Sequence, residues 1–111
     1  KRAYYIPGCA TVPPWLAQRL HGADLVFFDG TLFTDDEMIR AGTGIKTGQR
    51  MGHMSISGPD GSMHALSQLD IGRVVYVHIN NTNPIWRKGP EREAVEAAGF
   101  VIGHDGMEIV L

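Results

Sequence analysis

Three polar side chains lie where strand-like segments of the sequence end. Cys9 follows the segment 4–6, Asp29 closes the segment 24–29, and His78 lies near the end of the segment 73–79. In open α/β sheets, ligands bind beyond the carboxyl ends of the strands, where neighbouring strands bring their last residues together. A thiol, a carboxylate and an imidazole are all metal ligands. The sequence therefore predicts a candidate metal or substrate site at this edge of a sheet.

Each of these residues also has a structural interpretation. His78 can be a buried histidine whose ring bonds to the backbone, and Asp29 can accept the amide protons of Gly30 and Thr31 in a turn. Cys9 can be an inert apolar side chain, because a thiol reacts or binds metal only where its surroundings favour the thiolate. Local sequence favours these structural interpretations, so both possibilities stay open at this point.

The segment 42–61 adds further candidates. It carries six glycines and little apolar periodicity, which predicts a long loop, and loops of this length are usually functional or disordered. His53 in this loop can reach a neighbouring site. Lys46 and Arg50 can bind an anionic substrate, although such short basic runs are more often only solvated. A substrate with carboxylates would pair with them, order the loop and bring His53 over itself.

A mainly parallel sheet must bring the candidate residues together. The apolar runs 25–28 and 74–77 lack polar alternation, which is typical of strands covered on both faces. Helices are expected between the strands, because parallel neighbours need a crossover connection. The predicted fold class is therefore α/β, with a terminal hairpin around 103–106. The predicted strands are 4–6, 24–29, 73–79, 100–102 and 107–111, and the predicted helices are 13–21, 34–41, 59–69 and 90–98.

Composition limits the class of protein. The 111 residues, 43% hydrophobic and 20% charged, predict one globular unit, residues 1–111, and the net charge of -2 predicts no nucleic-acid partner. Neither a membrane span nor a signal peptide is visible, and one cysteine fits a reducing compartment, so we expect a cytoplasmic protein without a membrane partner. The spacings are not those of a zinc finger, a P-loop, a GxGxxG strand–helix turn or a GxSxG elbow.

Several motifs of this chain closely resemble, in the same order, the C-terminal part of the PqqB family of pyrroloquinoline quinone (PQQ) biosynthesis. That family belongs to the metallo-β-lactamase superfamily, so the resemblance implies that this chain is the C-terminal half of an αββα sandwich. The N-terminal half, with the superfamily's His-x-His-x-Asp-His metal motif, is expected to lie outside this chain, as part of a longer protein. The motifs include residues 6–9, 25–32, 51–54 and 78–84.

The resemblance also implies roles for individual residues. His78 matches a metal-ligand histidine, His53 matches a loop histidine that donates a proton or contacts the substrate, and Asp29 matches an acidic residue that orients this histidine. Cys9 falls at or beside the position of the carboxylate that bridges two metals in related hydrolases. The residues expected to contact the substrate or to support the metal ligands are Cys9, Lys46, Arg50, Asn80 and Asn81.

The missing bridging carboxylate argues against a two-metal hydrolase. The resemblance implies instead a single Fe(II) ion, with Zn(II) as the alternative metal, in an oxygenase that hydroxylates the tyrosine ring of a small Glu-Tyr-derived peptide. Two other functions stay open. One is a non-catalytic half of the fold or a carrier of PQQ or its precursor, and the other is a two-metal ester or phosphodiester hydrolase. The expected partners are the peptide, the N-terminal half and, in a homo-oligomer, further copies of the chain.

Overall fold

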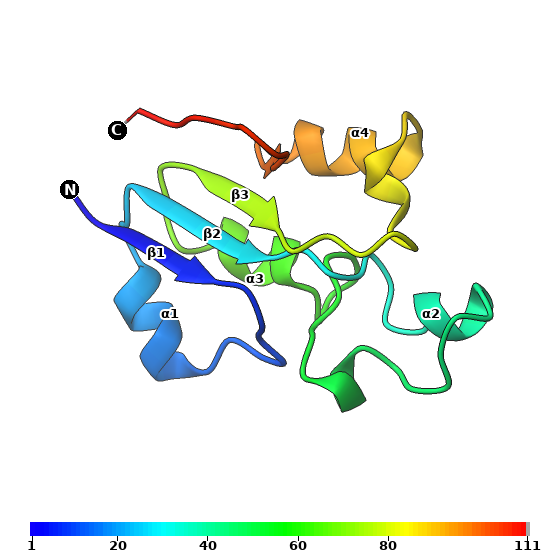
Figure 1. Ribbon diagram of the computed structural model, residues 1–111. Coiled ribbons are helices and arrows are strands. Elements are labelled where there is room, and N and C mark those ends of the chain that lie inside the picture. The colour runs from blue at the N-terminus through cyan, green and yellow to red at the C-terminus, as the bar shows by residue number, and fades with distance from the viewer. Residues whose placement is uncertain (111) are drawn as a thin grey trace.

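A parallel four-stranded sheet forms the centre of the computed structural model, which describes residues 1–110 (Figure 1). The strands lie side by side in chain order: β1 (Ala3–Ile6), β2 (Leu25–Asp29), β3 (Val74–Val77) and β4 (Val101–Ile102). Each neighbouring pair runs parallel, so the carboxyl ends of the strands meet at one edge. The predicted α/β class with a parallel sheet is confirmed.

Short helices connect these strands. They are α1 (Pro14–Leu20), α2 (Glu37–Arg40), α3 (Ser62–Ser67) and α4 (Pro90–Ala97), with the 3₁₀ turns η1 (Gln49–Met51) and η2 (Pro84–Trp86). Figure 1 shows α1 below β1, α3 behind the strands, α4 beyond β3 at the top of this view, and α2 beyond the carboxyl ends of the strands. None of the helices in the described part of the chain is long and apolar enough to cross a membrane.

One face of the sheet carries the hydrophobic core. Val26 and Phe28 of β2 and Tyr76 of β3 are completely buried on this face. They share it because successive side chains of a strand point to opposite faces and Phe28 lies opposite Tyr76. The Tyr76 hydroxyl shares a hydrogen bond of 2.8 Å with the Ser62 hydroxyl of α3, so this helix is tied to the sheet. The helices contribute Leu16, Leu20, Leu66 and Val95 to the same core.

The opposite face of the sheet is partly open. Tyr5 is 66% exposed, and its ring lies 6.1 Å from the ring of Phe27 on the neighbouring strand. Phe27 and Val77 are half-buried. This face therefore presents apolar side chains to the outside.

The predicted terminal hairpin is wrong. β4 pairs parallel with β3, and residues 107–110 form no strand, while Leu111 lies outside the described residues. The chain does turn after Gly103, since the amide of Met107 donates to the carbonyl of His104 and Gly106 has a φ of +79°. A turn signal predicts a change of direction, but it supplies no pairing partner for the residues that follow.

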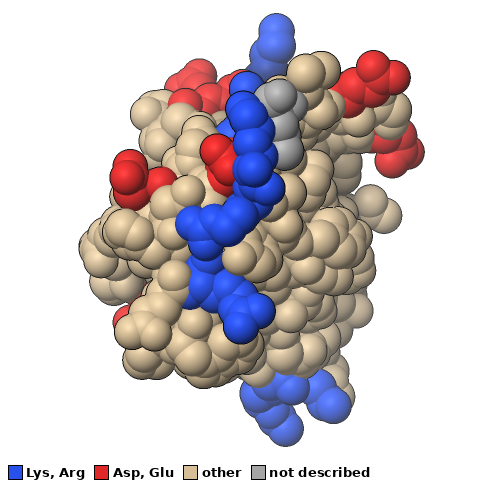
Figure 2. Space-filling view, turned by 90° about the vertical axis from the view of Figure 1, so that its left-hand side faces the viewer, with Lys and Arg blue, Asp and Glu red and all other residues tan. Residues whose placement is uncertain are grey.

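Basic side chains gather at the amino ends of the strands. Figure 2 shows a stripe of Lys and Arg on the side of the molecule that forms the left of Figure 1. Arg2, which precedes β1, donates from its guanidinium to the carbonyls of Arg19 and His21, at 3.2 and 2.8 Å, at the carboxyl end of α1. This stripe lies across the sheet from the edge that carries the predicted site.

Candidate metal centre

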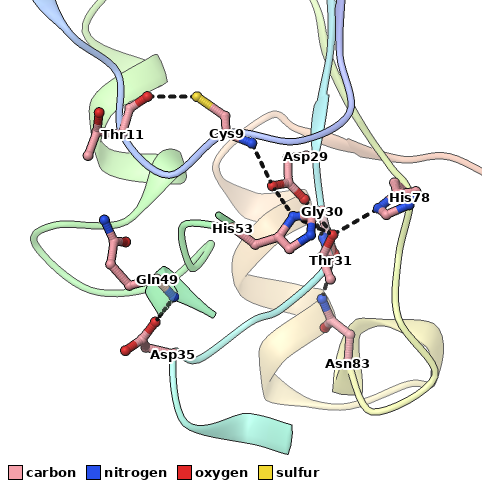
Figure 3. Close-up of polar contacts among 10 residues, drawn as sticks. All are labelled: Cys9, Thr11, Asp29, Gly30, Thr31, Asp35, Gln49, His53, His78 and Asn83. Atoms are coloured by element: carbon pink, nitrogen blue, oxygen red, sulfur yellow. Dashed lines mark hydrogen bonds and ion pairs between the residues drawn. The ribbon is translucent and has the colours of Figure 1, made fainter. Parts of the chain in front are cut away.

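Three of the predicted residues meet at the carboxyl ends of β2 and β3, where the loop 42–61 brings His53 to Asp29 and His78 (Figure 3). Asp29 is completely buried, His53 is half-buried and His78 is exposed. One ligand atom from each lies within 4.8 Å of the others, and no other group of this kind occurs among residues 1–110. We call these three residues the His–Asp cluster.

Asp29 accepts hydrogen bonds at both carboxylate oxygens. Oδ1 accepts from the amide and the hydroxyl of Thr31, at 3.0 and 2.6 Å. Oδ2 accepts from the amide of Cys9 at 3.1 Å and contacts Nδ1 of His53 at 2.7 Å. The turn interpretation of Asp29 is therefore correct for the amide of Thr31, but the same carboxylate also holds a histidine.

The two histidines of the cluster lie face to face. Their ring centroids are 5.7 Å apart, with 23° between the ring planes. The Thr31 hydroxyl lies between them, 3.2 Å from Nδ1 of His53 and 3.0 Å from Nδ1 of His78. Because His78 is exposed, its interpretation as a buried histidine is wrong.

The backbone of His78 is unusual. Its φ is +56°, a left-handed conformation that is uncommon for residues other than glycine and that occurs often at functional sites. The surrounding chain holds it there, since the amide of Gly30 donates to the Val77 carbonyl at 2.8 Å and the amide of Asn80 donates to the Thr31 carbonyl at 3.1 Å. The turn after β2 and the segment after β3 are thus bonded on both sides of His78.

Asn83 adds a third bond between these segments. Its side chain is completely buried, its Nδ2 donates to the Gly30 carbonyl at 2.9 Å, and its Oδ1 accepts from the amide of Ile85 at 3.0 Å. Both the nitrogen and the oxygen of this amide have a partner, which agrees with the rule that buried polar groups are paired.

Gly30 allows the close approach of the two strand ends. A Cβ at this position would lie 2.9 Å from Cβ of Tyr76 and 3.1 Å from the Val77 carbonyl oxygen. We expect Gly30→Ala to lower the free energy of unfolding by about 1–3 kcal/mol, because overpacking forces the backbone to shift. Urea denaturation measures this loss. Gly8→Ala is the matched control, since its Cβ would make only an ordinary contact, 3.7 Å from His53, and equal losses in both variants would contradict the explanation.

The loop 42–61 places His53 through its own backbone bonds. The loop is confirmed as irregular apart from η1. The amide of His53 donates to the Gly48 carbonyl at 2.8 Å, and the amide of Met54 donates to the Cys9 carbonyl at 2.6 Å. These bonds keep His53 beside Asp29 without a substrate. The expectation that a bound peptide orders the loop therefore concerns its other residues, and it stays a prediction.

Cys9 turns its backbone, not its sulfur, to the His–Asp cluster. Its Sγ donates to the carbonyl of Thr11 at 2.6 Å and points away from the histidines (Figure 3). Burial, and to a lesser degree the charge of Asp29, raises the pKa of the thiol above its ordinary value. This environment suppresses the thiolate and agrees with the interpretation of Cys9 as an inert side chain.

We expect the Cys9 thiol to react slowly with iodoacetamide. A raised pKa leaves less thiolate at pH 8 than in an unfolded peptide, so alkylation of the folded chain should be slower and should accelerate as the pH rises through the raised pKa. Mass spectrometry of the native chain, with the urea-unfolded chain as control, measures the two rates. A native rate equal to or above the unfolded rate would contradict this prediction.

The other predicted residues lie outside the cluster. Lys46, Arg50 and Asn81 are exposed, and no hydrogen bond or ion pair of the described residues joins their side chains to the cluster. Asn80 is half-buried and donates from its side chain to the hydroxyl of Thr82 at 2.7 Å. Their proposed contacts with a substrate stay predictions.

Two residues that hold the site together, Thr31 and Glu37, are not predicted from the sequence as parts of it. The sequence predicts for Thr31 only that its amide donates to Asp29 in a turn. Glu37, one of the acidic residues in the predicted 34–41 helix, is buried and accepts from the amide of Phe33 at 2.9 Å and from the Thr82 hydroxyl at 2.5 Å. It joins α2 to the segment after His78. The sequence does not indicate this role, because acidic residues at the start of a helix, such as Glu37 and its neighbours, usually interact with the helix dipole.

The sequence of this chain is similar to those of known proteins. A family model described as a beta-lactamase superfamily domain matches residues 1–79, a range that includes the whole His–Asp cluster. The chain belongs to this superfamily. Within the superfamily, its sequence is 67% identical over 111 residues to a coenzyme PQQ synthesis protein B of Rhizobium meliloti (strain 1021), covering 100% of this chain and 37% of that protein. The corresponding protein of Ruegeria pomeroyi is 60% identical over 110 residues, covering 98% and 37%.

A solved structure of the superfamily has the same fold. The crystal structure of Zn(2+)-bound PqqB from Methylobacterium extorquens superimposes with a TM-score of 0.94 at 53% sequence identity, covering 96% of this chain and 39% of that chain. The resemblance to PqqB is therefore confirmed. The chain spans 37% of the length of the relatives named above.

Proposed function

We propose that this chain is part of a metal-dependent protein of PQQ biosynthesis and that the His–Asp cluster belongs to its metal centre. The observation that carries the proposal is the convergence of Asp29, His53 and His78 at the carboxyl edge of the sheet. The names of the relatives support the biosynthetic role, and the zinc of the solved relative supports a metal.

The donor atoms of the cluster suit Fe(II) and Zn(II), since imidazole nitrogen is a common ligand of both. We assign His78 as a metal ligand, because its exposed ring follows β3 directly and is held by the bonds around it. Fe(II) at this site would supply the activation of O₂, whereas Zn(II) would supply a Lewis acid. The zinc of the solved relative keeps the second metal as an explicit alternative.

The finer proposal is hydroxylation of the tyrosine ring of a small Glu-Tyr-derived peptide. One ring C–H bond becomes C–OH, and O₂ supplies that oxygen atom. Two electrons from a reductant such as ascorbate, together with two protons, convert the other oxygen atom to water. His53 is the group that holds or accepts a proton of the substrate at Nε2, because its Nδ1 is bonded to Asp29. Lys46 and Arg50 lie on the same loop and would pair with the carboxylates of the peptide.

The test uses the chain joined to the remainder of its protein, loaded separately with Fe(II) and with Zn(II). With O₂, ascorbate and a synthetic Glu-Tyr peptide, we expect the peptide to gain the mass of one oxygen atom only with Fe(II). No gain with either metal would overturn the hydroxylase. Two catalytic metal ions per chain, after subtraction of any structural zinc, would favour the hydrolase.

A second candidate function, a non-catalytic half of a larger fold, has its own supporting observation. The face of the sheet with Tyr5, Phe27 and Val77 presents apolar side chains to the outside, and exposed apolar faces often mark interaction sites. We expect the isolated chain to bind the remainder of the protein. A cooperatively folding monomer that binds Fe(II) or Zn(II) with micromolar affinity on its own would overturn this candidate.

A further inference from the structure

We infer that Thr31 is a positioning residue whose hydroxyl connects Asp29 to His78, so that one buried carboxylate orients both histidines. In this arrangement His78 keeps its proton on Nδ1 and has a free lone pair on Nε2. The tautomer itself does not depend on the proposed metal centre. Only its consequence rests on that proposal, namely that His78 binds the metal through Nε2.

The proton positions follow from the short contact between Thr31 and Asp29. The hydroxyl oxygen of Thr31 lies 2.6 Å from Oδ1 of Asp29. A carboxylate has no proton to donate, so the hydroxyl must donate its one proton to Oδ1. The hydroxyl can then only accept from the histidines, and His78 at 3.0 Å must donate from Nδ1.

His53 is subject to the same reasoning. Its Nδ1 lies 2.7 Å from Oδ2 of Asp29 and 3.2 Å from the Thr31 hydroxyl, and both oxygens are acceptors. A proton on Nδ1 satisfies both contacts, the shorter one being with Asp29. The two stacked rings therefore carry the same tautomer, and in each ring Nε2 is the unprotonated nitrogen.

Asp29 has no free lone pair for a metal ion in this arrangement. A carboxylate offers about four lone-pair positions, and Asp29 fills them with the amides of Cys9 and Thr31, the Thr31 hydroxyl and Nδ1 of His53. Its side chain is also completely buried. Asp29 therefore acts through the histidines, as carboxylates that orient metal-binding histidines do.

Thr31 is itself held in place. It is 7% exposed, its amide donates to Asp29, and its carbonyl accepts from the amide of Asn80 at 3.1 Å. The hydroxyl thus approaches His78 from a fixed backbone on the neighbouring strand end. A turn at this position needs only the bond from the Thr31 amide to Asp29. The contact between the Thr31 hydroxyl and His78 is not needed for the turn, so it points to a role in orienting the histidine.

The test compares Thr31→Val, which keeps the shape and removes the hydroxyl, with Thr31→Ser, which keeps the hydroxyl. Long-range ¹H–¹⁵N correlation spectra of the metal-free chain, recorded where both rings are neutral, report the tautomer of each histidine. We expect the Nδ1–H tautomer for both in the wild type. Thr31→Val should shift His78 towards the Nε2–H tautomer and leave His53 unchanged, and Thr31→Ser should restore the wild-type spectrum.

Metal titration separates this inference from the proposed function. In the chain joined to the remainder of its protein, with Zn(II) as the probe, Thr31→Val should bind about 10–100-fold more weakly, as loss of a partner of a ligand histidine does. Thr31→Ser and the exposed control Thr43→Val should bind like the wild type. An Nε2–H tautomer of His78 in the wild type overturns the inference without any variant. If the tautomers behave as expected but no form binds Zn(II) or Fe(II), the inference stands and the proposed metal centre fails.

Discussion

His78→Ala should weaken metal binding more than any other single change in this chain. It removes a proposed ligand atom, so we expect the affinity of the whole protein for Zn(II) or Fe(II) to fall by more than the roughly 10–100-fold that loss of a supporting residue costs. Competition with a chelator of known affinity measures the change. Stability should change little, because the ring is exposed.

His64→Ala is the matched control for this measurement. His64 is also an exposed histidine, but it lies on α3 and contacts Gln68 rather than the His–Asp cluster. We expect its metal affinity to equal that of the wild type. If His78→Ala bound metal as well as His64→Ala, His78 would not be a ligand and the proposed metal centre would have to be abandoned.

Asp29→Ala should cause the largest loss of stability among the residues of the cluster. The change leaves the amides of Cys9 and Thr31, together with the Thr31 hydroxyl, without their buried acceptor. Buried donors without partners are costly, and we expect the free energy of unfolding to fall by about 2–4 kcal/mol. Urea denaturation followed by circular dichroism measures the loss.

Asp60→Ala is the control for this stability measurement, because Asp60 is exposed and surface substitutions of this kind usually change stability by less than about 0.5 kcal/mol. Equal stability of Asp29→Ala and Asp60→Ala would show that Asp29 does not organise the strand ends. Together with His78→Ala, the measurement distinguishes a residue that holds the site from one that binds the metal.

The local pattern of the sequence is sufficient to predict the sheet and the edge where the site lies. The apolar runs within β2 and β3 predict buried strands, and the helices between them require parallel pairing. Because the carboxyl ends of parallel strands meet at one edge, this pattern places Asp29 and His78 together. The role of His53 depends on the resemblance to a known family, because a histidine in a glycine-rich loop has no periodicity that places it.

Other features depend on contacts between distant segments, and only the tertiary structure decided them. Residues 107–110 form no strand, although β4 is an edge strand whose only neighbour in the described sheet is β3. The amide of Cys9 is bonded to Asp29, whereas its thiol points to the carbonyl of Thr11. The sequence alone determined which strand ends share an edge, since strand direction and side-chain alternation follow from local pattern. The tertiary structure decided which atoms meet there, since the bond between Thr31 and His78 joins residues that lie 47 positions apart in the chain.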